Sequence, residues 1–218
     1  MTVNRSTTKV VKFSKLAADS ELGQVLVRLM MACNDFSIAN EMMGQWRNPT
    51  TRKQEARAHS AQRYFLRLQI SHVCEAMDMV DEIERSPKLK AALAATDGQT
   101  RASFDKLRTY KRSKHYRTMK LVRNKVSSHY DPVWIKEVIE DLDQKHPGTV
   151  ASISMGNEAL DWHFEPGDMV EDRLVVRKIF EIPADADVRV EVDKILVELH
   201  EIAAVFGDFA GYFVKYHC

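Results

Sequence analysis

Two long stretches of helical periodicity restrict the folds that are open to this chain. From Ser20 to Trp46 apolar side chains recur every three or four residues, and the same spacing returns from about Thr51 to Arg85. Such spacing places the apolar side chains on one face of a helix. Pro49 lies in the short linker between the stretches, and proline disfavours a helical conformation in the residue before it. The sequence therefore predicts two long helices that pack as an antiparallel hairpin.

The composition is that of a helical globular protein. Glycine and proline are sparse, with 8 and 6 among 218 residues, which favours long helices over a turn-rich sandwich or barrel. The net charge is only +1, so any attraction to a polyanion has to come from local clustering. Cys33, Cys74 and Cys218 form no Cys-x-x-Cys pair, which argues against a disulfide framework or a zinc knuckle. We therefore expect a reducing, cytoplasmic compartment, and no apolar run is long enough to span a membrane.

A basic segment from Arg101 to Lys125 predicts a third long helix, which continues to about Tyr130. It contains ten Lys or Arg residues and a single acid, Asp105. Charge runs usually form solvated faces, but such faces mix both signs, and this one hardly does. A face of one sign is typical of a groove that binds a polyanion. The residues expected to contact phosphate are Lys114, Arg117, Lys120, Lys125 and Tyr130.

The rest of the chain predicts a helix, an extended insert and a final helix. Asp131 and Pro132 are expected as N-cap and first position of a helix that ends at His146-Pro147-Gly148. Short β-branched and aromatic runs from Ala159 to Ile182, around a Pro166-Gly167 turn, indicate a small β-hairpin or extended insert. Asp187 then opens the last helix. We expect a mainly α fold, with a flexible lead (1–19), a helical bundle (20–146), and an insert and C-terminal helix packed on the bundle (147–218).

Arg123, Asn124 and His129 gather at the end of the basic segment, where Asp131-Pro132 breaks the helix. An imidazole transfers protons near neutral pH, and a guanidinium can hold a phosphate and stabilise charge in the transition state. RNA supplies its own nucleophile, the 2′-hydroxyl, so no metal and no cofactor is expected. The chemistry predicted is RNA phosphodiester cleavage. Residues six apart diverge by about 120° on a straight helix, so a second chain is needed to complete the site.

The pattern Arg123-Asn124, four further residues and His129, late in a long helix of a helical chain, resembles the signature of the HEPN superfamily. The resemblance covers roughly residues 20 to 145 and implies a HEPN-like bundle of four to five helices. It implies a metal-independent endoribonuclease of toxin–antitoxin, abortive-infection or antiviral type. It further implies a homodimer with two motifs in one cleft, and it allows a cognate antitoxin protein as a second partner.

By this resemblance, Arg123 contacts the phosphate of the RNA, Asn124 is the supporting polar residue, and His129 is the acid and base. Some toxin members carry His-x-Tyr, whereas here Tyr130 follows His129 directly. Two other interpretations stay open. One is a non-catalytic module of HEPN-like fold that binds nucleotide, nucleic acid or a partner protein. The other gives Arg123 and His129 a purely structural part, at a helix end and paired with acids such as Asp131.

Overall fold

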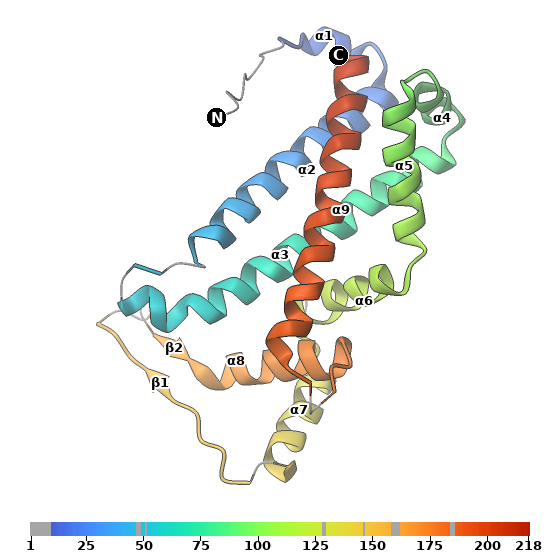
Figure 1. Cartoon of the computed structure of the whole chain (residues 1–218). Helices are drawn as coiled ribbons and strands as arrows, with labels where there is room; N and C mark the ends of the chain where they lie inside the picture. Colours follow the sequence, from blue (N-terminus) through green and yellow to red (C-terminus); the bar gives the residue numbers. More distant parts are fainter. Residues whose placement is uncertain are drawn as a thin grey trace.

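The computed structural model is a mainly α-helical bundle, and it describes residues 10–46, 49–50, 52–127, 130–145, 147–157, 162–183 and 186–218 (Figure 1). These ranges contain nine α-helices, the π-helical segments η1 and η3, and one sheet of two antiparallel strands. Residues 1–9 of the expected N-terminal lead lie outside the described ranges. α1 (Phe13–Ala17) and the C-terminus lie together at the top of Figure 1, whereas α7 (Pro132–Lys145) lies at the bottom.

α2 (Ser20–Gln45) and α3 (Arg52–Arg85) form the antiparallel pair that the sequence predicts (Figure 1). The side chain of Asp19 caps α2 by accepting a hydrogen bond from Leu22 N over 3.1 Å. Gly23 allows α1 to approach α2 closely, since a Cβ at this position would lie 1.9 Å from the carbonyl oxygen of Leu16. The local sequence therefore fixes both the start of α2 and the way α1 packs on it.

Three phenylalanines of α9 (Val188–His217) lie at the centre of the hydrophobic core. Phe206, Phe209 and Phe213 are fully buried. The ring of Phe206 contacts Phe36 of α2 at a centroid distance of 5.6 Å, and Phe209 contacts Phe104 of α5 (Gly98–Lys111) at 5.2 Å. α4 (Pro87–Ala94) connects α3 to α5. The C-terminal helix therefore shares one core with the helices of the N-terminal half.

The basic segment is divided, and the prediction of one continuous helix from Arg101 to about Tyr130 is wrong. α5 ends at Lys111, α6 spans Lys114–Val122, and the wider turns of η1 follow at Arg123–Ser127. Ser113 starts α6, because its hydroxyl accepts a hydrogen bond from Tyr116 N over 3.1 Å. The bend between α5 and α6 therefore comes from a serine cap inside a run of cations.

The sheet consists of β1 (Ile153–Ser154) and β2 (His163–Phe164), with Ile153 opposite Phe164. This confirms a small antiparallel pair before the C-terminal helix. The β-branched run that follows is helical, however, and forms α8 (Glu165–Asp172) and η3 (Arg173–Ile179). Pro166 lies in the first turn of α8, where its missing N–H is tolerated. The expected Pro166-Gly167 turn and the strands after it are therefore corrected to a helix.

α7 (Pro132–Lys145) begins as the sequence predicts. The Asp131 carboxylate accepts hydrogen bonds from Val133 N over 3.1 Å and from Trp134 N over 3.2 Å. Pro132 occupies the first position, where no hydrogen-bond donor is needed. His146, at the expected end of this helix, lies outside the described residues. Figure 1 shows α7 and α8 at the same, lower end of the bundle.

Candidate functional site

Arg123 is the first residue of η1 and lies half-buried against α3. Its NH2 donates to Glu75 Oε1 over 2.6 Å, and its NH1 donates to Asn124 Oδ1 over 3.3 Å. The side chain remains 33% exposed. The guanidinium is therefore held between α3 and η1 by a carboxylate and an amide, yet it stays within reach of a ligand from solvent. The carboxylate is that of Glu75, not that of Asp131.

His129 lies outside the described residues, so its pairing with Arg123 remains a prediction from the sequence. The segment that leads to it is described. Val126 is buried and anchors η1 in the core. Asp131 N donates to Lys125 O over 3.4 Å, which closes a wide turn across the end of η1. Short π-helical turns occur frequently at functional sites, and η1 is one of them in form.

An exposed cationic face runs along α6 into η1. Lys114, Arg117, Lys120 and Asn124 are exposed, and steps of three and four residues place them on one side of the helix. Lys114 lies 3.8 Å from the exposed Glu181. No described acid forms an ion pair with Arg117 or Lys120. The part of the basic segment nearest Arg123 therefore presents uncompensated positive charge to solvent.

Three cations of α5 and of the bend after it pair with acids on α3. Lys111 pairs with Asp81, and Glu84 lies 3.6 Å from Arg108 and 3.7 Å from Arg112. The basic segment, which carries almost only positive charge in the sequence, therefore lies partly beside negative charges of α3 in the fold. We call Lys114, Arg117, Lys120 and Asn124 the cationic face, and the groove along the whole segment stays a prediction.

Lys125 and Tyr130 differ in their availability to a ligand. Lys125 Nζ lies 2.6 Å from Asp131 Oδ2 and 5.2 Å from the centre of the Trp134 ring. The hydrogen bond from Lys125 and those from the start of α7 lower the pKa of Asp131 below its usual value. Tyr130 is 73% exposed. Lys125 therefore holds the start of α7, while Tyr130 is free to meet a partner.

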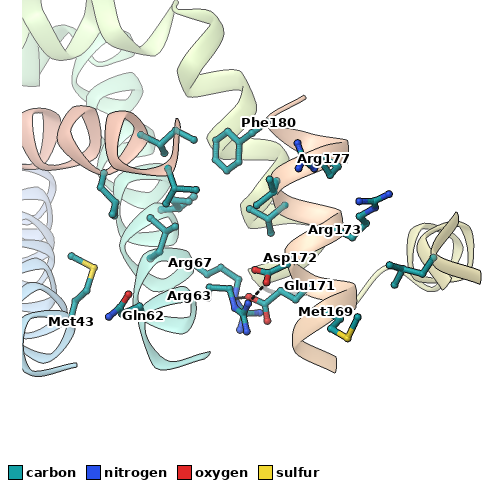
Figure 2. Close-up of a pocket in the computed structure, with 18 residues that line it drawn as sticks. Met43, Gln62, Arg63, Arg67, Met169, Glu171, Asp172, Arg173, Arg177 and Phe180 are labelled. Atoms are coloured by element: carbon teal, nitrogen blue, oxygen red, sulfur yellow. Dashed lines mark ion pairs between the residues drawn. The ribbon is translucent and has the colours of Figure 1, made fainter. Parts of the chain in front are cut away.

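A second charged cluster, which the sequence analysis missed, joins α3 to α8 (Figure 2). Arg63 NH2 lies 3.2 Å from Asp168 Oδ2, and Arg63 also pairs with Asp172. Arg67 Nε lies 2.9 Å from Glu171 Oε1, although their orientation does not make a hydrogen bond. The spacing in the sequence carries a signal, because both arginines and all three acids recur at helical steps of three or four residues.

Arg67 connects this cluster to η1. Its NH1 donates to the Val126 carbonyl over 3.4 Å, and its own carbonyl accepts a hydrogen bond from Ser127 Oγ over 3.4 Å. Burial raises the pKa of Glu171, while Arg67 and Arg63 oppose that shift. The backbone beside the predicted catalytic residues is therefore tied to α3 by a side chain that also contacts α8.

Ser60, His163 and Asp168 have the residue types of a hydrolase triad but not its geometry. Ser60 Oγ donates to Asp168 Oδ2, and His163 Nε2 lies 2.8 Å from the same oxygen and 3.4 Å from Ser60 Oγ. A triad requires the serine on one ring nitrogen and the carboxylate on the other. Here both meet Nε2. The cluster therefore fastens β2 and α8 to α3 and does not activate the serine.

Within the described residues, no three His, Cys, Asp or Glu side chains are grouped so that they could hold a metal ion. None of the helices in those ranges combines the length and apolar character needed to cross a bilayer. Comparison of the chain with protein-family models, with curated proteins and with solved structures finds no match.

Proposed function

We propose that this protein is a HEPN-like, metal-independent endoribonuclease of toxin or abortive-infection type. The observation that carries this proposal is the position of Arg123. It stands half-exposed on a π-helical turn, with Asn124 against its guanidinium and with the cations Arg117 and Lys120 on the adjoining face. In this proposal Arg123 binds the scissile phosphate, Asn124 orients the guanidinium, and His129 transfers protons.

The contacts of Arg123 are compatible with an exchange of partners. Its ion pair with Glu75 joins side chains that are 33% and 56% exposed, and pairs of this kind contribute roughly 1 kcal/mol or less. A phosphate makes two charge-assisted hydrogen bonds to a guanidinium, which are stronger than one contact to an exposed carboxylate. RNA drawn to Arg117 and Lys120 can therefore displace Glu75 from Arg123.

The proposed reaction uses the RNA as its own nucleophile. The 2′-oxygen forms a bond to phosphorus as the bond from phosphorus to the 5′-oxygen breaks, which leaves a 2′,3′-cyclic phosphate and a 5′-hydroxyl. One imidazole takes the proton of the 2′-hydroxyl, and a second imidazole gives a proton to the departing 5′-oxygen. Arg123 stabilises the extra negative charge on the phosphate oxygens. Two copies of His129, from two chains, supply both proton transfers.

The surface of α7 offers a place for the second chain. Tyr130 and Ile139, which are 73% and 53% exposed, line one surface hollow together with Pro132 and Ile135, and exposed apolar patches mark interaction sites. Lys136 and Glu140 lie beside them, with their charged ends 3.7 Å apart. Across a two-fold axis, the Lys136 of one chain can meet the Glu140 of the other. Such a dimer brings the chain just before α7, which carries His129, close to its copy.

The test is cleavage of a labelled RNA in the presence of EDTA. We expect His129→Ala to lose about 100-fold or more of the activity and Arg123→Ala to lose a comparable amount, with helical content unchanged by circular dichroism. Arg112→Ala is the matched control, because Arg112 belongs to the same basic segment but faces Glu84. The proposal is wrong if the His129→Ala variant still cleaves RNA, or if EDTA stops cleavage by the wild-type protein.

The dimer has its own test. Ile139→Asp should yield a monomer in sedimentation experiments and should lose cleavage, whereas Val150→Asp, at a position that is 88% exposed and outside α7, should leave both the dimer and the cleavage unchanged. A wild-type protein that is monomeric and active would exclude the composite site.

The Arg123–Glu75 ion pair favours a second candidate, a non-catalytic module of the same fold. A guanidinium that a carboxylate already neutralises can serve to hold η1 on α3. The module would bind nucleotide, nucleic acid or a partner protein through the cationic face. RNA binding that depends on Arg117 and Lys120, with no cleavage product under any condition, would select this candidate.

A further inference from the structure

A cavity of about 400 Å³ lies between α3, α8, η3 and α9, and none of the four residues of the cationic face is among those that line it (Figure 2). Pockets for small molecules measure roughly 300–1,000 Å³. The walls of this cavity are mainly apolar, and they include Leu66, Ile70, Val175, Phe180, Ile195 and Leu196.

The two ends of the cavity differ in charge. Figure 2 shows Arg63, Arg67, Glu171 and Asp172 turned toward one another at one end, where each arginine faces a carboxylate. Figure 2 places Phe180 and Arg177 toward the other end. The carboxylates at the first end already neutralise the two arginines. They would repel an anionic group of a ligand, so such a group would bind at the end near Phe180.

Arg177 is the cation that is available at this second end. Its NH1 donates to the carbonyls of Ile182, over 2.8 Å, and Pro183. Among the described residues no acid pairs with it, and its Nε and NH2 make no hydrogen bond. The neighbouring Arg173, in contrast, contacts Asp141 over 3.0 Å. Arg177 is therefore a partly buried positive charge that has unused donors beside an apolar cavity.

The backbone around Arg177 holds it in place. Phe180 N donates to Val175 O over 3.0 Å and Ile182 N to Val176 O over 3.1 Å, which keeps the wide turns of η3 and returns the chain toward the guanidinium. Glu181 has a φ of 54°, in the left-handed region that residues other than glycine rarely adopt. Strained residues of this kind cluster at ligand sites. The guanidinium is thus fixed before any ligand arrives, which reduces the entropy lost on binding.

We infer that this cavity binds a small monocarboxylate with an apolar body, such as an aryl or medium-chain alkyl acid. The planar carboxylate takes the free Nε and NH2 edge of Arg177, which matches it in geometry. The apolar body extends along Leu66, Ile70 and Val175 and displaces water from them. A cationic ligand is disfavoured by Arg177, and a ligand without charge leaves its donors unused. This site is separate from the cationic face and does not depend on RNA cleavage.

The test is calorimetric titration of the full chain with octanoate, 1-octanol and octylammonium, which share an alkyl chain and differ in charge. We expect octanoate to bind at one site, with an affinity about tenfold or more above those of 1-octanol and octylammonium. A charge-assisted bidentate pair accounts for a difference of this size. Arg177→Met should lower octanoate affinity by about the same factor and abolish the preference over octanol. Arg112→Met, at an exposed cation away from the cavity, should change neither.

A second variant tests the location of the site independently of Arg177. Val192 lines the cavity from α9 and is only partly buried, so Val192→Trp should fill the space and abolish octanoate binding while circular dichroism and Tm stay close to wild type. The inference is overturned if octanoate does not bind, if octanol binds as well as octanoate, or if binding is unchanged in both Arg177→Met and Val192→Trp. None of these outcomes bears on cleavage of RNA.

Discussion

Arg123 NH2 lies 2.6 Å from Glu75 Oε1, and this contact joins the first residue of η1 to the C-terminal half of α3. Both side chains are exposed enough for water to screen their attraction, so the pair contributes little to stability. Its importance is positional. Glu75 occupies the edge of the guanidinium that a phosphate of RNA needs, so the carboxylate competes with the proposed substrate.

The first prediction concerns this competition. Glu75→Gln removes the charge and keeps the shape of the side chain, so we expect RNA affinity to rise by about two- to fivefold, as fits the loss of roughly 1 kcal/mol of competing interaction. Tm should change little. Fluorescence anisotropy with a labelled single-stranded RNA measures the effect. Glu84→Gln is the control, since it frees Arg108 and Arg112 away from η1; an equal gain there would show that net charge alone is responsible.

The second prediction concerns the cationic face. Arg117 and Lys120 are exposed and form no ion pair with any described acid, so each can neutralise one phosphate. Removing both as Arg117→Ala/Lys120→Ala should reduce the slope of log K against log salt by about 1.4, which is two contacts at ~0.7 each for single strands. The double variant Arg108→Ala/Arg112→Ala removes cations that already face Glu84. It should change the slope by less than half as much, and a larger change would place the RNA along α5.

The helices that the sequence predicts best are those whose apolar spacing is long and regular. Val25, Leu26 and Leu29 define the buried face of α2 in the sequence as clearly as in the structure, where all three are buried. The bend at Ser113 was missed because one serine among many cations is a weak signal. The run Leu174 to Ile179 was predicted as extended because β-branched residues in a short apolar run do not separate a buried strand from a buried helix.

The site was predictable only in the part that is local in the sequence. The cap at Asp131 and the exposure of Arg117 and Lys120 follow from neighbouring residues. The ion pair of Arg123 with Glu75 joins residues 48 positions apart, and it depends on how η1 packs against α3. The availability of Arg177 to a ligand also depends on tertiary packing, because among the described residues no acid comes close enough to pair with it. Such relations arise from tertiary packing, which residue spacing does not encode.

The third prediction is a pH dependence at Asp131. The hydrogen bond from Lys125 lowers the pKa of this carboxyl below 3.8, as do those from the backbone of α7. Its folded pKa is below its unfolded pKa, so its stabilisation is complete above about pH 4 and is lost as the pH falls through the folded value. Wild-type Tm should therefore fall more steeply on acidification than that of Asp131→Asn, which keeps the capping oxygen without the charge.

Asp131→Ala removes both the cap and the ion pair with Lys125, so it should melt below Asp131→Asn at neutral pH. Thermal melts by circular dichroism from pH 7 to pH 3 separate the three proteins. A difference between wild type and Asp131→Asn that does not vary with pH would show that the Lys125 contact contributes no stability.

The fourth prediction uses Cys74 as a probe of the core. Cys74 is 2% exposed, and burial raises the pKa of its thiol to about 11. At pH 8 its thiolate fraction is then about 100-fold below that of a thiol with the usual value near 9, and the thiolate is the reactive form. In a Cys33→Ser/Cys218→Ser background, Cys74 should therefore resist a thiol reagent in the native protein and react only as urea unfolds it, in step with the loss of helical circular dichroism.

The same probe shows whether α9 belongs to the folding unit of α3. Phe209 is fully buried and its ring contacts Phe104 of α5, so Phe209→Ala should reduce the free energy of unfolding by about 3–5 kcal/mol through the lost burial and the cavity left behind. If one core unites the chain, the urea midpoint for Cys74 labelling should shift together with the midpoint for helical signal. If α9 unfolds by itself, Phe209→Ala should lower the helical signal at urea concentrations where Cys74 is still protected.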